Sequence, residues 1–352
     1  MKNLVKGALF HSPLPEMMLH YAAPRRLTVL SYHRISEPIG CDYPFDEQLV
    51  SATPEEFRRE LLYMKRHFDV MSIKDLVRGL KERSLPKRPA IVTFDDGYAD
   101  NHDVALPLLT EAGLTACFFL STGLVGTRNI PWWDQVSCCF KHSAVTKIVS
   151  PFGEAEPSFS CEPKKSLSEI NRFHRTMKGA MWPQALEYLE DLKVQTKVDP
   201  SEYALKNLFM SWDQARTLVS RGMEAGGHSR THPALGNVTD EKMARDEIIG
   251  GYRDLVRELG IDPLAFSYPE GSEQAMSAVC DRIIAEAGFA MSFSCLRYLA
   301  PRQPANPWRL PRLHAEFGDN FNEFRLALAR AVATGVGGLV FAACTDLGAW
   351  VF

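Results

Sequence analysis

Short apolar runs alternate along the chain with stretches in which apolar residues recur at helical spacing. The runs are rich in β-branched and aromatic residues and predict buried strands, whereas the helically spaced stretches predict amphipathic helices. The predicted strands cover residues 27–33, 68–72, 90–94, 115–120, 223–227, 264–268, 289–293 and 338–343, and residues 308–314 look like the end of a further strand. The predicted helices cover residues 53–64, 73–82, 103–112, 211–221, 239–259, 273–287 and 322–333. This alternation favours parallel βα units, in a barrel or a doubly wound sheet.

The alternation breaks between about residues 127 and 210, which hold Pro131-Trp132-Trp133-Asp134 and a piece rich in Gly, Pro and Ser. We expect an insertion between core elements that forms a lid or a wall beside a site, with a peripheral subdomain as the alternative. The expected organisation is an N-terminal extension over residues 1–24 and one α/β unit over residues 25–350 that carries this insertion.

The composition is that of an ordinary soluble protein: 352 residues, 45% hydrophobic and 24% charged. A net charge of −3 gives no indication of nucleic acid, and nothing points to a protein partner. Eight scattered cysteines without a Cys-x-x-Cys pair fit reduced core thiols. No run approaches the roughly 20 apolar residues of a membrane span. Lys6, His11 and Pro13 interrupt any signal-peptide stretch, so we expect a cytoplasmic protein.

Two adjacent carboxylates, Asp95 and Asp96, follow the apolar run 90–94 and precede Gly97. In an α/β protein, the residues just past the carboxyl end of a strand are where ligands bind. Two acids at such a place are costly to desolvate unless a cation or a proton compensates them. The pair is therefore a candidate site, with a helix-capping turn as the alternative.

A second cluster, His228-Ser229-Arg230-Thr231-His232, also follows a predicted strand. Two histidines four residues apart can face the same way and share a metal ion. Such a site needs a third ligand, and Asp95 or Asp96 is the available acid. Two histidines and one carboxylate leave positions open for water and substrate, which is typical of a catalytic site.

The two clusters together resemble the first two signature motifs of the polysaccharide deacetylases, carbohydrate esterase family four with its NodB-type domain. The resemblance extends to residues 32–35, 266–271 and 310–314, and so covers roughly residues 25 to 315. It implies a distorted (β/α) barrel of about seven parallel strands with a large insertion after the fourth. It also implies a divalent metal, zinc first with cobalt, nickel or manganese as alternatives, and hydrolytic N-deacetylation of a sugar in a polysaccharide, glycan precursor or glycoconjugate.

The resemblance also assigns roles to residues. Asp95 becomes the general base, and Asp96, His228 and His232 become the metal ligands. The backbone N–H of Tyr98, just after Gly97, is expected to stabilise the developing oxyanion. The expected contacts of the substrate are Tyr98, Tyr268, Pro269 and Gly271. Apart from the resemblance, Trp133 can supply a stacking surface for a sugar, with a place in the core as the alternative.

The chain departs from the family pattern at two residues, the one that orients the base and the one that protonates the leaving group. Ser267 stands where the family usually has the arginine that orients the base, and Arg312 is a candidate substitute, with a surface salt bridge or a backbone contact as the alternative. The family's late histidine, its general acid, is absent. His33 and His314 are both candidates for that role, and both can instead be structural.

These departures keep two other functions open. One is a metal-dependent amidohydrolase that acts on a non-sugar amide by the same chemistry. The other is a catalytically weak glycan-binding domain, against which the free acid Asp95 argues, because a pure binder has no use for a base beside a metal.

Overall fold

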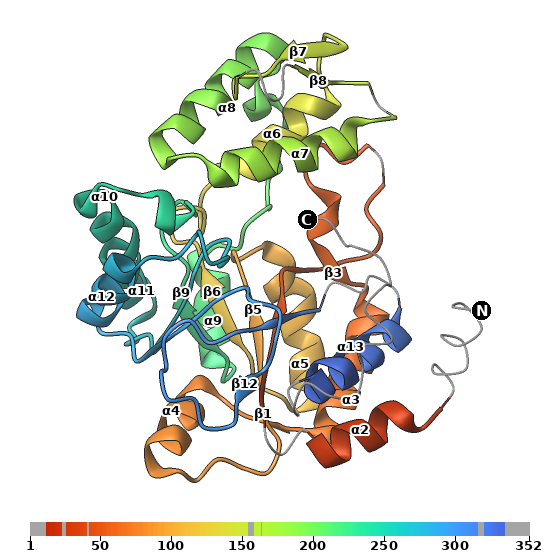
Figure 1. Cartoon of the computed structure of the whole chain (residues 1–352), viewed down its shortest axis with the longest axis vertical. Helices are drawn as coiled ribbons and strands as arrows, with labels where there is room; N and C mark the ends of the chain where they lie inside the picture. Colours follow the sequence, from red (N-terminus) through yellow and green to blue (C-terminus); the bar gives the residue numbers. More distant parts are fainter. Residues whose placement is uncertain are drawn as a thin grey trace.

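The computed structural model describes residues 12–22, 26–40, 42–153, 158–162, 164–315 and 320–334. Its centre is a mostly parallel sheet with the order β11-β10-β9-β6-β5-β1, with β4 beside β5 and β12 and β13 beside β1 (Figure 1). Only β12 is antiparallel to its neighbour in this sheet. This arrangement confirms the expected α/β class. The strands are β1 (Arg26–Tyr32), β4 (Asp69–Val70), β5 (Pro89–Phe94), β6 (Cys117–Leu120), β9 (Glu224–Gly227), β10 (Ala265–Ser267), β11 (Met291–Phe293), β12 (Ala300–Pro301) and β13 (Leu313–His314).

One segment joins the two ends of this row of strands. Leu310 forms a parallel bridge to Phe293 of β11, while β13 pairs in parallel with β1 through Leu30↔Leu313. Residues 310–314 therefore close the ring of strands into a distorted barrel. The strand predicted over residues 338–343 lies outside the described residues.

Helices pack around this sheet near the positions that the sequence predicts. Thr53 caps α3 by accepting the Glu56 N–H, and Ser211 and Gln214 form a capping box at α9. The predicted helix 273–287 starts later, because Ser277 caps it by accepting the Cys280 N–H. The helices are α2 (Leu14–Ala22), α3 (Pro54–His67), α4 (Ile73–Glu82), α5 (Leu106–Ala112), α9 (Trp212–Ser220), α10 (Glu241–Arg245), α11 (Gly251–Leu259), α12 (Ala278–Ala287) and α13 (Phe321–Thr334).

Two π-helical turns that the sequence does not reveal are continuous with these helices. One is η3 (Asn101–Ala105), which leads into α5, and the other is η6 (Asp246–Gly250), which joins α10 to α11. The predicted helix 239–259 is therefore one run of helix with a wider turn in its middle. Such turns occur frequently at functional sites.

Most of the chain between β6 and β9, residues 132–203, forms a separate layer at the top of Figure 1, although these two strands are direct neighbours in the sheet. This layer has its own buried aromatic residues, among them Phe140, Phe159 and Phe173. Its core is continuous with that of the barrel through Tyr98 and Phe266. Its elements are α6 (Trp132–Lys141), β7 (Lys147–Val149), β8 (Ser158–Ser160), α7 (Ser166–Gly179), α8 (Trp182–Thr196) and η4 (Pro200–Tyr203).

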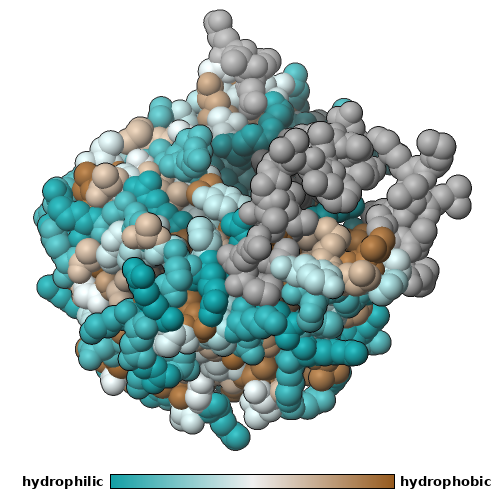
Figure 2. Space-filling model, turned by 60° about the horizontal axis from the view of Figure 1, so that its bottom comes forward, coloured by the Kyte–Doolittle hydropathy of each residue, from teal (hydrophilic) through white to brown (hydrophobic). Residues whose placement is uncertain are grey.

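A second small sheet pairs β2 (Arg34–Ile35) with β3 (Val50–Ala52). The six described cysteines are free thiols and five of them are buried, as expected for core thiols. Within the described part of the chain, no helix combines the length and the apolar character that crossing a membrane requires. Figure 2 shows a face that is mostly hydrophilic, with hydrophobic residues in small, separate patches.

Candidate active site

The two predicted clusters meet because their strands end at the same edge of the sheet. Asp95 and Asp96 follow β5, and His228 follows β9, which is separated from β5 only by β6. The Asp95 N–H donates to the Tyr32 carbonyl of β1 at 2.9 Å, so the acid pair begins in register with the end of that strand. The parallel topology thus places residues more than a hundred positions apart around one point.

Asp96, His228 and His232 form a buried triad with ligand atoms all within 4.8 Å of one another. The Asp96 Oδ1 lies 3.3 Å from His228 Nε2 and 3.4 Å from His232 Nε2. This oxygen has no hydrogen-bond partner in the described structure. His228 Nδ1 lies 2.8 Å from the Ser267 carbonyl oxygen, which fixes its proton there and leaves Nε2 facing Asp96. Two imidazole nitrogens and an unsatisfied carboxylate oxygen fit a divalent ion such as zinc.

Two residues of the triad and one residue next to it adopt backbone conformations that L-amino acids rarely adopt. The φ angles of Asp96, Ser229 and His232 are 73°, 57° and 62°, in the left-handed region. Each such residue costs on the order of 1 kcal/mol and persists only where its surroundings enforce it. The clustering of three of them at the triad supports a functional role for this turn geometry.

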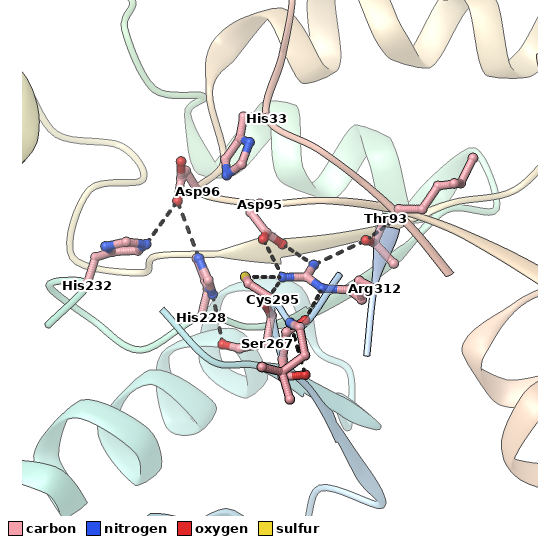
Figure 3. Close-up of polar contacts among 12 residues, drawn as sticks. His33, Thr93, Asp95, Asp96, His228, His232, Ser267, Cys295 and Arg312 are labelled. Atoms are coloured by element: carbon pink, nitrogen blue, oxygen red, sulfur yellow. Dashed lines mark hydrogen bonds and ion pairs between the residues drawn. The ribbon is translucent and has the colours of Figure 1, made fainter. Parts of the chain in front are cut away.

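Asp95 forms a bidentate ion pair with Arg312 (Figure 3). The two Nη–Oδ distances are 2.8 and 2.7 Å, and Asp95 and Arg312 are 1% and 0% exposed. Burial alone would raise the pKa of Asp95, but the Arg312 guanidinium and His228 hold this pKa well below its usual range. The carboxylate is therefore ionised at every pH at which the protein is expected to work.

Arg312 also contacts Ser267, the residue that stands where the resemblance led us to expect an arginine. Its Nη2 lies 2.8 Å from the Ser267 Oγ, and its Nη1 lies 3.2 Å from the Thr93 Oγ1. The small side chain of Ser267 leaves room for the guanidinium, which comes from residues 310–314, the segment that closes the barrel. The partner of Asp95 is thus supplied by this closing segment.

The two triad histidines have opposite pKa shifts. Burial lowers the pKa of His232 to about 4, so its ring is neutral at pH 7. Burial also acts to lower the pKa of His228, but the neighbouring Asp95 and Asp96 carboxylates outweigh it and raise this pKa. A bound metal ion would act against this rise, because a histidine ligand binds through a neutral ring.

The structure distinguishes the surroundings of His33 and His314. His33 follows β1 and lies beside Asp95 and Asp96 in Figure 3, close enough to interact electrostatically with both. His314 hydrogen-bonds to the thiol of Cys295. The two imidazole rings are 6.1 Å apart between centroids, so both stand at the same end of β1.

The aromatic side chains expected to contact substrate are buried. Tyr98 and Tyr268 are 0% exposed, and Trp133 is 6% exposed. Trp133 donates its indole N–H to the Tyr98 hydroxyl at 3.0 Å and packs its ring 4.5 Å from that of His232. Tyr268 donates its hydroxyl to Asp281 at 2.7 Å. This burial does not fit a side-chain contact with a sugar. Trp133 instead packs against the triad, Tyr98 hydrogen-bonds to Trp133, and Tyr268 packs on Phe266.

The loop after β10, which contains Pro269 and Gly271, brings in a residue that the sequence analysis did not mark. Glu270 has a φ of 60°, forms an ion pair with Lys178 of α7 at 2.7 Å, and acts electrostatically on His232. A Cβ on Gly271 would lie 2.4 Å from the Cys295 backbone nitrogen, so this glycine allows the loops after β10 and β11 to touch.

Cys295 is also a neighbour of the site that sequence reasoning missed. Its Sγ lies 3.5 Å from Arg312 Nη2. Burial acts to raise the pKa of the Cys295 thiol, but Arg312 and His314 outweigh it and lower this pKa. No local sequence pattern marks Cys295 or Glu270, because each reaches the site only through the register of adjacent strand ends.

Solved structures share this fold. The Streptococcus pyogenes deacetylase PplD, in complex with acetate, aligns with a TM-score of 0.55 and 16% identity over 87% of this chain and 98% of that one. IcaB from Ammonifex degensii aligns with a TM-score of 0.55 and 17% identity over 88% of this chain and 97% of that one.

Two curated relatives match shorter stretches. The Bacillus subtilis protein YxkH is 25% identical over 34% of this chain and 40% of its own length. The poly-beta-1,6-N-acetyl-D-glucosamine N-deacetylase of Staphylococcus epidermidis is 29% identical over 22% of this chain and 28% of its own length. The chain thus matches less than half the length of either relative.

The family model for polysaccharide deacetylases matches residues 82–149 and 173–291, together more than half of the chain. The matched ranges contain Asp95, Asp96, His228 and His232. The chain belongs to the polysaccharide deacetylase family.

Proposed function

We propose that this protein is a metal-dependent hydrolase that removes acetyl groups from N-acetylated sugars in a polysaccharide or glycan precursor. The observation that carries the proposal is a buried, ionised acid, Asp95, held by Arg312 directly beside the triad of Asp96, His228 and His232. Family membership supports the reaction, and the name of the Staphylococcus epidermidis relative supports an N-acetylglucosamine polymer as the first substrate to test.

Asp96, His228 and His232 are the residues that would hold the ion. Zinc suits this set of donors best, with cobalt, nickel or manganese as alternatives. When bound, such an ion would polarise the amide carbonyl and make water a better nucleophile. The donor set uses three protein ligands, as in catalytic rather than structural zinc sites.

Asp95 takes the role of general base. Its carboxylate is kept free of the triad by Arg312, which fixes both oxygens and holds the group ionised. It accepts the proton of the attacking water. The ion pair also makes the carboxylate a weaker base, so orientation rather than basicity is its main contribution.

His33 takes the role of general acid and protonates the departing amine. Its closeness to Asp95 and Asp96 favours it over His314, whose ring is engaged with Cys295. Backbone bonds hold His33 in place, since its N–H donates to Ser51 Oγ at 2.9 Å and its carbonyl accepts from Asn101 at 2.7 Å.

Acetate release from N-acetylglucosamine oligomers with β-1,6 and other linkages, in the presence of zinc, tests the proposal. We expect Asp95→Asn to bind zinc like the wild type and to lose activity by roughly 10²–10⁴-fold, whereas Asp96→Ala loses the zinc itself. Full activity of Asp95→Asn would remove Asp95 from the mechanism. Hydrolysis of non-sugar amides alone would favour the amidohydrolase, and oligomer binding without acetate release would favour the glycan-binding domain.

A further inference from the structure

The turn between the two triad histidines is unusually constrained. Ser229 and His232 have φ angles of 57° and 62°, and the backbone N–H groups of Arg230 and Thr231 find their acceptor outside the turn. A turn in this conformation needs outside partners, because buried N–H groups without acceptors are costly.

One carboxylate supplies these partners. The Oε2 of Glu247 accepts the N–H groups of Arg230 and Thr231 at 2.8 and 2.9 Å, and its Oε1 accepts the Thr231 hydroxyl at 2.6 Å. Glu247 is 6% exposed and lies in the π-helical turn η6. Its hydrogen bonds in the described part of the chain go to the residues between the triad histidines and not to the histidines themselves.

A second carboxylate ties this turn to the next strand end. Asp254 of α11 accepts the Thr122 hydroxyl at 2.9 Å and the Arg230 Nε–H at 3.1 Å. The N–H groups of Thr122 and Gly123, just after β6, donate to the carbonyls of Ser229 and Arg230 at 3.2 and 2.9 Å. The histidine turn is thus held from both sides.

Two glycines allow the helix to come this close. A Cβ on Gly250 would lie 2.9 Å from the Arg230 Cδ, and a Cβ on Gly251 would lie 3.4 Å from the Ser229 backbone. The π-helical turn and these glycines together let the carboxylate of Glu247 reach the turn.

We propose that Glu247 is a positioning residue for the metal centre: by holding Arg230 and Thr231 it sets the spacing and orientation of His228 and His232. This inference rests on the proposed function, in which that pair holds the ion. Groups that orient metal ligands from outside typically contribute about 10–100-fold to metal affinity.

Two substitutions and a neighbouring control test the proposal. Glu247→Ala removes all three hydrogen bonds, whereas Glu247→Gln keeps an oxygen for the two backbone N–H groups and loses the charge. Asp246→Asn is the control, because Asp246 is exposed and contacts only the Arg230 guanidinium, at 3.2 Å. Zinc affinity is measured by calorimetry. Amide hydrogen exchange at Arg230 and Thr231 and the ring ¹⁵N shifts of His228 and His232 are measured in the zinc-free protein.

We expect Glu247→Ala to bind zinc about 10–100-fold more weakly, with Glu247→Gln between it and the wild type and Asp246→Asn unchanged. Amide exchange at Arg230 and Thr231 and the displacement of the ring shifts are expected to change most in Glu247→Ala, less in Glu247→Gln and not in Asp246→Asn. Wild-type affinity and shifts in folded Glu247→Ala would overturn the proposal, and if that variant does not fold, the same result in Glu247→Gln overturns it. A wild type that binds no zinc would refute the proposed metal site alone, since the zinc-free readouts still decide the role of Glu247.

Discussion

At the scale of single residues, the ion pair of Asp95 and Arg312 is the feature of the site that depends most on both of its members. Both side chains are almost fully buried, and the guanidinium also contacts Ser267 and Thr93. Removing one member of such a pair leaves an uncompensated buried charge, which is costlier than the loss of the pair itself.

We therefore expect Arg312→Met to lower the free energy of unfolding by about 3–5 kcal/mol. The double variant Asp95→Asn/Arg312→Met should recover part of this loss, because neither charge then remains. Urea unfolding of the wild type, both single variants and the double variant gives the coupling energy. Losses that simply add would contradict a mutual compensation of the two charges.

The choice of general acid is a second question at this scale. We expect His33→Gln to lower kcat by roughly 10²-fold or more, the usual contribution of a general acid, with zinc affinity kept. His314→Gln is the matched variant at the same end of β1, and a smaller effect is expected because His314 is engaged with Cys295. Steady-state kinetics of acetate release compare them, and the reverse order would assign the acid role to His314.

Individual site residues differ in how far the sequence predicts them. Asp95, Asp96 and His228 are predictable because they stand at the end of apolar runs, and His232 because it follows His228 by four residues. Glu247 and Glu270 are not, because their contacts depend on a π-helical turn and on the register of neighbouring strands. Tyr98, Tyr268 and Trp133 look like sugar contacts in the sequence, yet large aromatic rings contribute most when buried.

At the scale of elements, α3 holds β1 and β5 through one buried acid. The Tyr32 hydroxyl donates to Glu60 of α3 at 2.9 Å, and the Tyr32 ring stacks on Phe94, the residue before Asp95. Burial raises the pKa of Glu60 to about 8. The carboxyl group is thus protonated in the folded protein at neutral pH, whereas in the unfolded chain it has its ordinary pKa near 4.5.

The unfolded state therefore binds fewer protons at Glu60 between about pH 4.5 and pH 8, so this group lowers stability as pH rises through that window. We expect Glu60→Gln to lose less stability than the wild type as pH rises, and to be more stable than the wild type at pH 8.5. Urea unfolding from pH 5 to pH 8.5 measures it. Glu55→Gln, an exposed position on the same helix, is the control. Asp134, whose pKa burial also raises to about 8, remains in both proteins, so part of the loss of stability persists in Glu60→Gln. A slope equal to that of the wild type would contradict the contribution of Glu60.

Elements are the level at which the sequence predicts most. Strands and helices of the barrel lie within a few residues of their predicted positions, since apolar periodicity and caps such as Thr53 and Ser211 are local signals. The later start of α12 and the π-helical turn η6 depend on how the chain packs around the site, which no local pattern encodes.

At the scale of the whole molecule, the layer formed by α6, α7 and α8 is tied to the candidate site. The indole N–H of Trp132 donates to the His232 carbonyl at 3.1 Å, and Asp134 accepts the backbone N–H of Asp46 at 3.0 Å. The sequence predicts that such a layer exists, because the βα rhythm breaks there. Its position could not be predicted, since it depends on contacts between residues far apart in the chain.

The ion pair of Lys178 and Glu270 gives a test of what the contact between this layer and the barrel contributes. It joins α7 to the loop after β10, beside His232, and the Lys178 carbonyl also accepts from Asn237 at 2.7 Å. The Lys178 side chain is 43% exposed, so solvent screens the pair and limits its contribution to about 0.2–1 kcal/mol.

We expect Lys178→Met to raise KM for the acetylated oligomer by up to about fivefold, which is the ratio that 1 kcal/mol produces, while kcat and zinc affinity stay unchanged. The layer is then held less firmly beside the site, but no group that touches the reacting atoms is lost. Lys193→Met is the control, because Lys193 pairs with Glu190 inside α8 and leaves the docking contacts intact. A fall in kcat or in zinc affinity, with KM unchanged, would show instead that Lys178 matters through the effect of Glu270 on His232, and that the contact between the layer and the barrel does not limit substrate binding.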